Sequence, residues 1–322
     1  MRARILGTGS YLPEGYLTND DLAQWLDTSD TWIRERTGIR ERHITKTGTV
    51  EMAVKAAEAA LANAGVTSEE IDLILVGTMT PDYFCPSVSC QVQAELGMEH
   101  AVCMDIGAAC SGFLFALATA QAYLTSGMAR TALVIGSETL SKVVDWSDRG
   151  TCVLFGDGAG AAVVGIDEKG VLAIDMGSKG SKGMALPCPG IPLQNPLQDA
   201  SEEGSQKSYI QMDGQEIFKF AIRTVPETVR RSLQAAGVCV GDVSHFFFHQ
   251  ANRRILETVA KNLRIPLEKV PMNIERTGNT AAASIPLLLD EWNRKGSLVR
   301  GEKLVLSGFG AGLSWGSIVM EW

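Results

Sequence analysis

The sequence lacks three features that mark common classes of protein. No apolar run approaches the ~18 residues that a membrane-spanning helix needs, so we expect no membrane partner. No Cys-x-x-Cys pair occurs, which argues against a zinc site. The seven cysteines are odd in number and several lie in apolar runs, which argues against a disulfide framework and favours a reducing cytosol.

Positive charge is also scarce. The chain has 29 Lys and Arg against 37 Asp and Glu, a net charge of −8. Because phosphate binding needs a positive surface, we expect no nucleic acid partner. Residues 1–9 lack the longer apolar core and cleavage site of a signal peptide and instead predict a first strand. We therefore expect a cytoplasmic protein.

The remaining composition is that of an ordinary globular protein. Of the 322 residues, 45% are hydrophobic and 20% charged, and the length suggests two domains or one large duplicated one. Capping residues and apolar periodicity predict alternating helices and strands. We expect helices from Thr18, from near Ser29, over 49–64 and over 86–96, and strands over 71–76, 132–135 and 243–248.

The second half of the chain repeats the plan of the first. Residues 64–66 (Ala-Gly-Val) end a helical pattern and precede an apolar run, and residues 236–238 do the same. The glycine turn and strand at 156–164 also resemble the segment 308–320. This self-similarity predicts a duplicated α/β unit. Between the halves, residues 177–208 are rich in Gly, Ser, Pro and Gln and predict a long surface loop.

Cys110 lies at a predicted turn from a strand to a helix. The apolar run 101–105 predicts a buried strand, and helical periodicity begins at Phe113. Only Gly, Ala and Ser stand beside the thiol, so nothing bulky blocks it. We expect the helix dipole and the free backbone amides to favour the thiolate, which is the nucleophilic form. The alternative is a small buried residue that packs the turn.

Two further positions are candidates for chemistry. His249, one of only four histidines, follows the strand 243–248, at the carboxyl end of which ligands bind in open α/β sheets. Asn279 follows Gly278 in a tight turn before a run of small residues. The alternatives are a histidine bonded to backbone and an asparagine that caps a helix. The turn 310–312 offers amides for an oxyanion hole, or is merely a hairpin.

Together these segments resemble one family, the β-ketoacyl-acyl-carrier-protein synthase III condensing enzymes of the thiolase-like superfamily. The resemblance implies a duplicated α/β fold layered α-β-α-β-α. Its N-terminal half, residues 1–168, would carry the nucleophile, and its C-terminal half, residues 169–322, the histidine and asparagine. The matching segments occur in order over nearly the whole chain: 27–39, 109–113, 148–151, 155–160, 249–252, 278–280 and 309–312.

The resemblance implies a decarboxylative Claisen condensation that starts fatty acid synthesis. Cys110 would take the acyl group from acyl-CoA, with backbone amides of Cys110 and of the turn at Ala311 stabilising the oxyanion. Malonyl-carrier protein would then lose CO₂. His249 and Asn279 would stabilise the enolate, and Phe309 would favour neutral CO₂ over the carboxylate. The carbanion would attack acyl-Cys110, and no metal or redox cofactor is implied.

The resemblance also assigns binding residues. Trp32 and Arg149 would hold the adenine of CoA, Arg36 its phosphates and Asn252 the pantetheine. The alternative is that Trp32 belongs to a helix core and that the arginines are solvated.

A positive segment suggests where the carrier protein docks. Residues 212–264 contain eight Lys or Arg against five Asp or Glu, a difference of +3 in a chain of −8. An acidic carrier protein would be steered to such a surface. Within it, the resemblance assigns docking to Lys219, Arg254 and Lys261. The alternative is a set of ordinary solvated helix faces.

Cys85 limits the substrate prediction. In the family this position reaches from the partner subunit into the acyl pocket and often carries phenylalanine, so the resemblance implies a homodimer. Because cysteine is smaller, we expect the pocket to admit acyl chains longer or wider than acetyl. The preferred chain remains open.

Two other functions remain open at this stage. One is an acyltransferase or thioesterase of specialised metabolism that uses the same three residues on another nucleophile. The other is a catalytically silent subunit that only binds CoA or carrier protein. Consumption of malonyl-carrier protein with release of CO₂ distinguishes the condensing enzyme from both.

Overall fold

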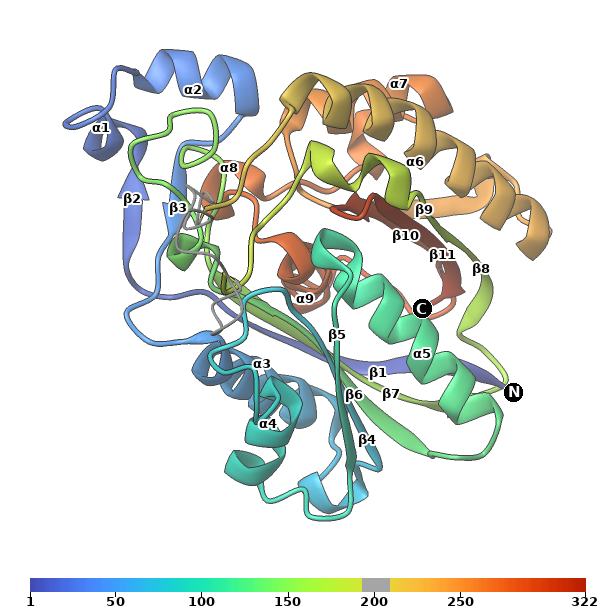
Figure 1. Cartoon of the computed structure of the whole chain (residues 1–322). Helices are drawn as coiled ribbons and strands as arrows, with labels where there is room; N and C mark the ends of the chain where they lie inside the picture. The colour runs from blue at the N-terminus through green and yellow to red at the C-terminus, as the bar shows by residue number, and fades with distance from the viewer. Residues whose placement is uncertain (193–208) are drawn as a thin grey trace.

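The computed structural model describes residues 1–192 and 209–322. Two sheets lie in layers that alternate with helices (Figure 1). The predicted duplicated fold with α-β-α-β-α layers is confirmed.

The first sheet has five strands. From one edge to the other it runs β1 (Arg2–Tyr11), β7 (Gly158–Asp167), β6 (Thr131–Glu138), β4 (Leu73–Gly77) and β5 (Val102–Ile106). The first three strands pair antiparallel, and β6, β4 and β5 pair in parallel. Parallel strands need crossovers, which the helices between them supply.

The second sheet repeats this order with four strands. It runs β8 (Val171–Ser178), β11 (Ser314–Glu321), β10 (Lys303–Gly310) and β9 (Val243–Phe248). Again the first three pair antiparallel and the last pair is parallel. The division at residues 168 and 169 stays a prediction, although β7 ends and β8 begins on either side of it.

Helices form the other layers (Figure 1). The outer pair α3 (Thr49–Ala64) and α4 (Val88–Leu96) covers the first sheet, and α6 (Gly214–Ala236) and α7 (Arg253–Leu263) cover the second. Between the sheets lie α5 (Gly112–Thr125) and α9 (Ser284–Arg294). Because α5 packs against both sheets, it is apolar on nearly every side. By contrast, α7 has one exposed polar face.

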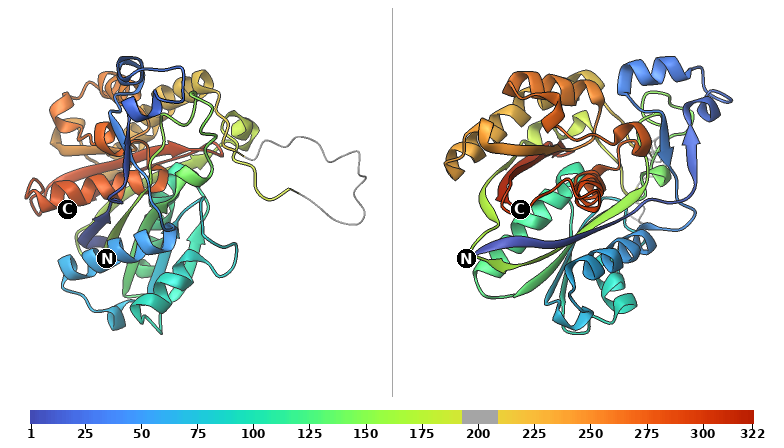
Figure 2. Two further views of the ribbon diagram at one scale, coloured as in Figure 1. Left: turned by 90° about the vertical axis from the view of Figure 1, so that its left-hand side faces the viewer. Right: turned by 180° about the vertical axis from the view of Figure 1, so that it is seen from behind.

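Short elements complete the chain near α7. They are β2 (Tyr16–Thr18), α1 (Asn19–Leu22), α2 (Asp30–Thr37), β3 (Glu41–His43) and α8 (Ile274–Thr277). Figure 2 shows α2 beside α7, far apart in sequence. One hydrogen bond joins them, from Asn252 Nδ2 to the Arg36 carbonyl at 3.0 Å.

Most predicted elements are confirmed, and α3 begins and ends where the sequence places it. Two expectations need correction. The strand at 101–105 is not buried, because β5 is the edge strand of its sheet and Val102 is 54% exposed. The predicted loop 177–208 begins inside β8 and contains a 3-10 turn at 180–185, while its residues 193–208 lie outside the described part.

Candidate active site

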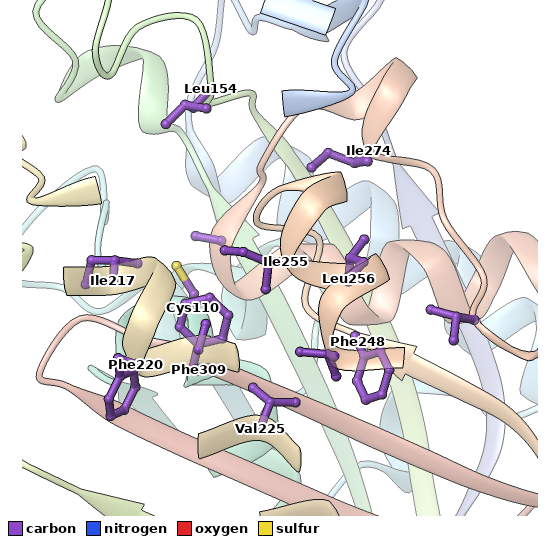
Figure 3. Close-up of a cluster of buried hydrophobic side chains, with 14 of the residues drawn as sticks. Cys110, Leu154, Ile217, Phe220, Val225, Phe248, Ile255, Leu256, Ile274 and Phe309 are labelled. Atoms are coloured by element: carbon purple, nitrogen blue, oxygen red, sulfur yellow. The ribbon is translucent and has the colours of Figure 1, made fainter. Parts of the chain in front are cut away.

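Cys110 lies in a tight turn between β5 and α5. Ala109 has φ of +45°, a left-handed conformation that is uncommon for a residue with a Cβ. The strand β10 passes very close, since a Cβ on Gly310 would lie 2.8 Å from the Cys110 nitrogen. Glycine is therefore required at 310 for β10 to reach the turn. Cys110 itself is 8% exposed and packs among apolar side chains (Figure 3).

Burial decides the ionisation of the Cys110 thiol. It raises the pKa of Cys110 to about 12, the charge of Glu138 acts in the same direction, and the backbone N–H of Cys110 opposes them. The expectation that the turn favours a thiolate in the free enzyme is therefore wrong. The cost of desolvating the charge exceeds the help from the backbone amide of Cys110.

His249 follows the last residue of β9. Its backbone N–H donates to the Ser307 carbonyl at 2.9 Å, which extends the pairing with β10. Its ring Nδ1 lies 2.7 Å from the Ser284 hydroxyl. Burial lowers the pKa of His249 to about 3, so the imidazole is neutral near pH 7. A neutral imidazole has one N–H, and its second nitrogen accepts.

Ser284 is the functional residue that the sequence analysis missed. Its hydroxyl oxygen accepts the backbone N–H of Gln250 at 3.4 Å, and its own hydrogen is then available to His249 Nδ1. In that arrangement the imidazole hydrogen lies on Nε2. No local pattern indicates this pair, because 35 positions separate the residues and only the packing of α9 beside β9 joins them.

The side chain of Asn279 is oriented by its own turn. Its backbone is held on both sides, through its N–H to the Leu154 carbonyl at 2.8 Å and its carbonyl to the Gly156 N–H at 3.1 Å. Its side-chain Oδ1 accepts the Ala281 N–H at 2.9 Å. Because the oxygen is used in this way, Nδ2 remains as the donor group of the amide.

Phe309 packs against His249. The two rings meet edge to face with centroids 5.6 Å apart, and Phe309 also meets Phe220 edge to face at 6.3 Å. A Cβ on Gly308 would lie 2.9 Å from the His249 Cβ, so β10 touches His249 as closely as it touches the Cys110 turn. Strand β10 thus brings the two halves of the site together.

A cavity of about 450 Å³ unites these residues. Cys110, His249, Asn279, Phe309 and Ala311 all line it, so the predicted catalytic residues lie around one space. Most predicted binding residues line it too, whereas Cys85 and Lys261 are exposed and do not. The binding residues in its wall are Trp32, Arg36, Arg149, Asn252, Lys219 and Arg254.

Two arginines stack on Trp32 where the cavity wall meets α2. The guanidinium of Arg36 lies 4.8 Å from the ring centroid and that of Arg149 lies 5.3 Å from it. Arg149 also pairs with the exposed Asp27 carboxylate at 3.2 Å. Asn252 caps α7, its Oδ1 accepting the Arg254 N–H at 2.8 Å. Trp32 is therefore a cation-stacking residue at the cavity wall as well as a partner of the core.

Glu138 is a second group that the sequence analysis missed. It is fully buried at the end of β6, where burial raises its pKa to about 7. The hydroxyls of Thr78 and Thr80 and the N–H of Met79 all donate to its carboxylate. Since Met79 lines the cavity, Glu138 anchors one part of the cavity wall.

Residues 1–192 and 209–322 lack two features that mark other classes of protein. They contain no group of three or more His, Cys, Asp or Glu arranged to hold a metal ion. None of their helices is long and apolar enough to cross a membrane.

Comparisons with known proteins agree with one another. Residues 104–180 match the family model of 3-oxoacyl-[acyl-carrier-protein (ACP)] synthase III, and residues 233–322 match that of its C-terminal part. The chain is 47% identical over 320 residues to a beta-ketoacyl-[acyl-carrier-protein] synthase III of Clostridium acetobutylicum, covering 99% of this chain and 98% of that protein.

Solved structures give the same result. The crystal structure of 3-oxoacyl-[acyl-carrier-protein] synthase III from Aquifex aeolicus has a TM-score of 0.92 and 44% identity, covering 99% of this chain and 100% of that one. The priming beta-ketosynthase from the R1128 polyketide biosynthetic pathway has a TM-score of 0.91 and 37% identity, covering 99% and 96%.

Proposed function

The chain belongs to the 3-oxoacyl-[acyl-carrier-protein] synthase III family of condensing acyltransferases, and we propose that it carries out its condensation through an acyl-Cys110 thioester. The substrates are an acyl-CoA primer and malonyl-carrier protein. The observation that carries the proposal is that Cys110, His249 and Asn279 line one cavity, with the His249 Nδ1 and Asn279 Oδ1 already bonded elsewhere.

The first step is acyl transfer to Cys110. The thiol loses its proton, its sulfur attacks the thioester carbonyl of acyl-CoA, and the carbon–sulfur bond to CoA breaks. CoA leaves as the thiol. Backbone amides at Cys110 and Ala311 stabilise the tetrahedral oxyanion. The product is a neutral thioester, so the thiolate charge that burial disfavours exists only during the transfer.

The second step is decarboxylation of malonyl-carrier protein. The bond from the malonyl α-carbon to its carboxylate breaks, CO₂ leaves, and the electron pair forms an enolate. His249 Nε2–H and Asn279 Nδ2–H donate to the thioester oxygen that gains the negative charge. The apolar ring of Phe309 beside His249 disfavours the charged carboxylate relative to neutral CO₂.

The third step joins the two carbon chains. The α-carbon of the enolate attacks the acyl-Cys110 carbonyl, and the carbon–sulfur bond to Cys110 breaks. The β-ketoacyl chain leaves on the carrier protein, and the released Cys110 sulfur takes up a proton. The chemistry needs no metal or redox cofactor, because each bond change is accounted for by these residues, the two substrates and one proton taken from water.

CoA binds along the wall formed by α2 and the start of α7. The Trp32 ring offers a stacking surface for adenine, and Arg36 offers positive charge to the phosphates. Because the Arg149 guanidinium lies only 5.3 Å from the Trp32 centroid, an adenine entering between them displaces Arg149 from its contact with Asp27. Asn252 borders the path of the pantetheine.

The carrier protein docks on the exposed faces of α6 and α7. Lys219, Arg254 and Lys261 are exposed there, and none of them forms a salt bridge within the described part of the chain. Lys219 and Arg254 also line the cavity, so an acidic domain held by them lies at its mouth. This charge pattern steers an acidic partner toward the opening through which its arm must pass.

The enzyme works as a homodimer in the cytoplasm. Among residues 1–192 and 209–322, strand β5 pairs only with β4 and its other edge is open, and Val102 on it is exposed. The nearby Tyr83 and Phe84 are 61% and 79% exposed, an unusual exposure for two consecutive aromatic residues. A second copy that pairs along β5 covers this apolar surface and brings Cys85 of one chain toward the other chain's cavity.

Priming of polyketide synthesis is the second candidate function, which the likeness to the R1128 enzyme favours. Single-turnover acylation tests both. The enzyme is mixed with a panel of acyl-CoAs, the mass of the Cys110 peptide is read, and malonyl-carrier protein is then added. We expect acyl mass on Cys110, lost with release of CO₂, in the wild type and in Cys239→Ser. Acylation followed only by hydrolysis would refute condensation, and the panel identifies the primer.

A further inference from the structure

Helix α4 is tied to the edge strand β5 at two levels. The backbone N–H groups of Val88 and Ser89 donate to the Asp105 carboxylate at 2.8 and 2.9 Å. About one and a half turns along the helix, Gln93 Nε2 donates to the Ala101 carbonyl at 2.9 Å. Helix and strand therefore run in opposite directions, with a fixed register between the two ties.

Cys90 on α4 and Cys103 on β5 lie between these two ties. Cys103 packs against the apolar cluster that lies under α3 and α4, so its side chain is on the same face of the sheet as α4. Its Sγ donates to the Ala101 carbonyl at 3.6 Å. Burial, followed by the charge and the hydrogen bond of Cys90, raises the pKa of Cys103 to about 12. The two thiols are therefore neighbours in space.

The two thiols of the pair differ from each other in their access to solvent. Cys90 is exposed, Cys103 is half-buried, and Cys110 is buried. Thiol–disulfide exchange requires two thiols with different roles, and an exposed thiol beside a half-buried one fits them. The first thiol meets the reagent, and the second displaces it.

We propose that Cys90 and Cys103 form a reversible intramolecular disulfide, a modification site distinct from Cys110, by exchange with a low-molecular-weight disulfide. The bridge joins α4, which follows Cys85, to the strand that leads into the Cys110 turn.

The exchange proceeds in two balanced steps. The Cys90 thiolate attacks one sulfur of the reagent, its sulfur–sulfur bond breaks, and one reagent thiol leaves. The Cys103 thiolate then attacks the Cys90 sulfur and expels the second reagent thiol. Both cysteine protons end on the two released thiols. The cysteine pair is oxidised by two electrons, and the reagent is reduced by the same two.

The charge of Cys90 does not oppose the second step. One cause of the raised pKa of Cys103 is the negative charge that Cys90 carries when ionised. Once Cys90 is in a mixed disulfide it is neutral, and this cause disappears. Burial still raises the pKa of Cys103, but the opposition from the Cys90 charge is gone at the moment when Cys103 must attack.

Mass mapping of the full-length enzyme tests the site. The protein is incubated with oxidised glutathione, free thiols are alkylated, and the chain is cleaved after glutamate. Cleavage after Glu95 and Glu99 separates Cys90 from Cys103. We expect one linked pair of fragments, which dithiothreitol separates. Cys85→Ser and Cys239→Ser retain the link.

Two variants identify the partners. In Cys103→Ser we expect glutathione to remain on Cys90, and in Cys90→Ser the link to disappear. Retention of glutathione on Cys90 in the wild type, with Cys103 alkylated, would overturn the proposal. A linked pair that persists in Cys90→Ser would also overturn it, because the link would then come from Cys85. A linked pair that persists in Cys103→Ser would do the same, because the link would then come from Cys110. Because these readouts need no condensation, they are independent of the proposed function.

Discussion

Removing the Ser284 hydroxyl tests how His249 is held. In Ser284→Ala, the imidazole Nδ1 loses its partner at 2.7 Å in a site where both residues are buried. A neutral hydrogen bond of this kind contributes about 0.5–1.5 kcal/mol, and a buried group left unpaired costs about 1–3 kcal/mol. The imidazole reduces that cost either by shifting its hydrogen from Nε2 to Nδ1 or by rotating the ring. Either change weakens the Nε2–H donor.

The magnitude follows from these energies. A loss of about 1.4 kcal/mol of enolate stabilisation slows decarboxylation about tenfold. Complete loss of one donor to an oxyanion slows a reaction by about 10² to 10³, which sets the upper limit. Acylation of Cys110 needs neither His249 Nε2–H nor Asn279 in the proposed mechanism, so its rate remains within about twofold of wild type.

The assay measures the two half-reactions separately. Acylation is followed by CoA release, and decarboxylation by CO₂ release from malonyl-carrier protein on enzyme whose Cys110 is already acylated. Ser284→Thr retains a hydroxyl and should restore most of the rate. Ser232→Ala removes another buried serine, which bonds to Ser317, and controls for stability. Decarboxylation at the wild-type rate in Ser284→Ala, or an equal loss in acylation, would refute the role given to Ser284.

Three further predictions concern the pocket, the docking surface and the thiol. Cys85→Phe should shift the acyl-CoA preference toward shorter chains, and an unchanged chain-length profile would contradict the pocket hypothesis. Arg254→Glu combined with Lys261→Glu should raise KM for malonyl-carrier protein at least tenfold (about 1.4 kcal/mol) and leave acylation by acyl-CoA nearly unchanged. Because burial raises the pKa of Cys110 to about 12, its thiolate fraction, and with it the rate of alkylation, should rise about tenfold per pH unit between pH 7 and 10. A plateau near pH 8 would show that the pKa is lower.

The sequence by itself determined most of the elements and some of their ends. Thr18 and Ser29 cap helices, and Gly65 ends α3 with φ of +66°, because these signals act over three or four residues. The duplication was also visible, since both halves repeat the same order of apolar runs and glycine turns. The motifs around Cys110, His249 and Asn279 were recognisable because each lies in a short, distinctive segment.

Only the tertiary structure decided how these segments act on one another. The exposure of β5 depends on its place at the end of a sheet, which strand periodicity does not reveal. The bond from Ser284 to His249 depends on the packing of α9 beside β9. The ionisation of Cys110 depends on how completely the folded chain excludes water from the turn, since desolvation outweighs the favourable amide of the same turn. Short-range signals are written in neighbouring residues, whereas strand order, burial and long-range hydrogen bonds are properties of the assembled layers.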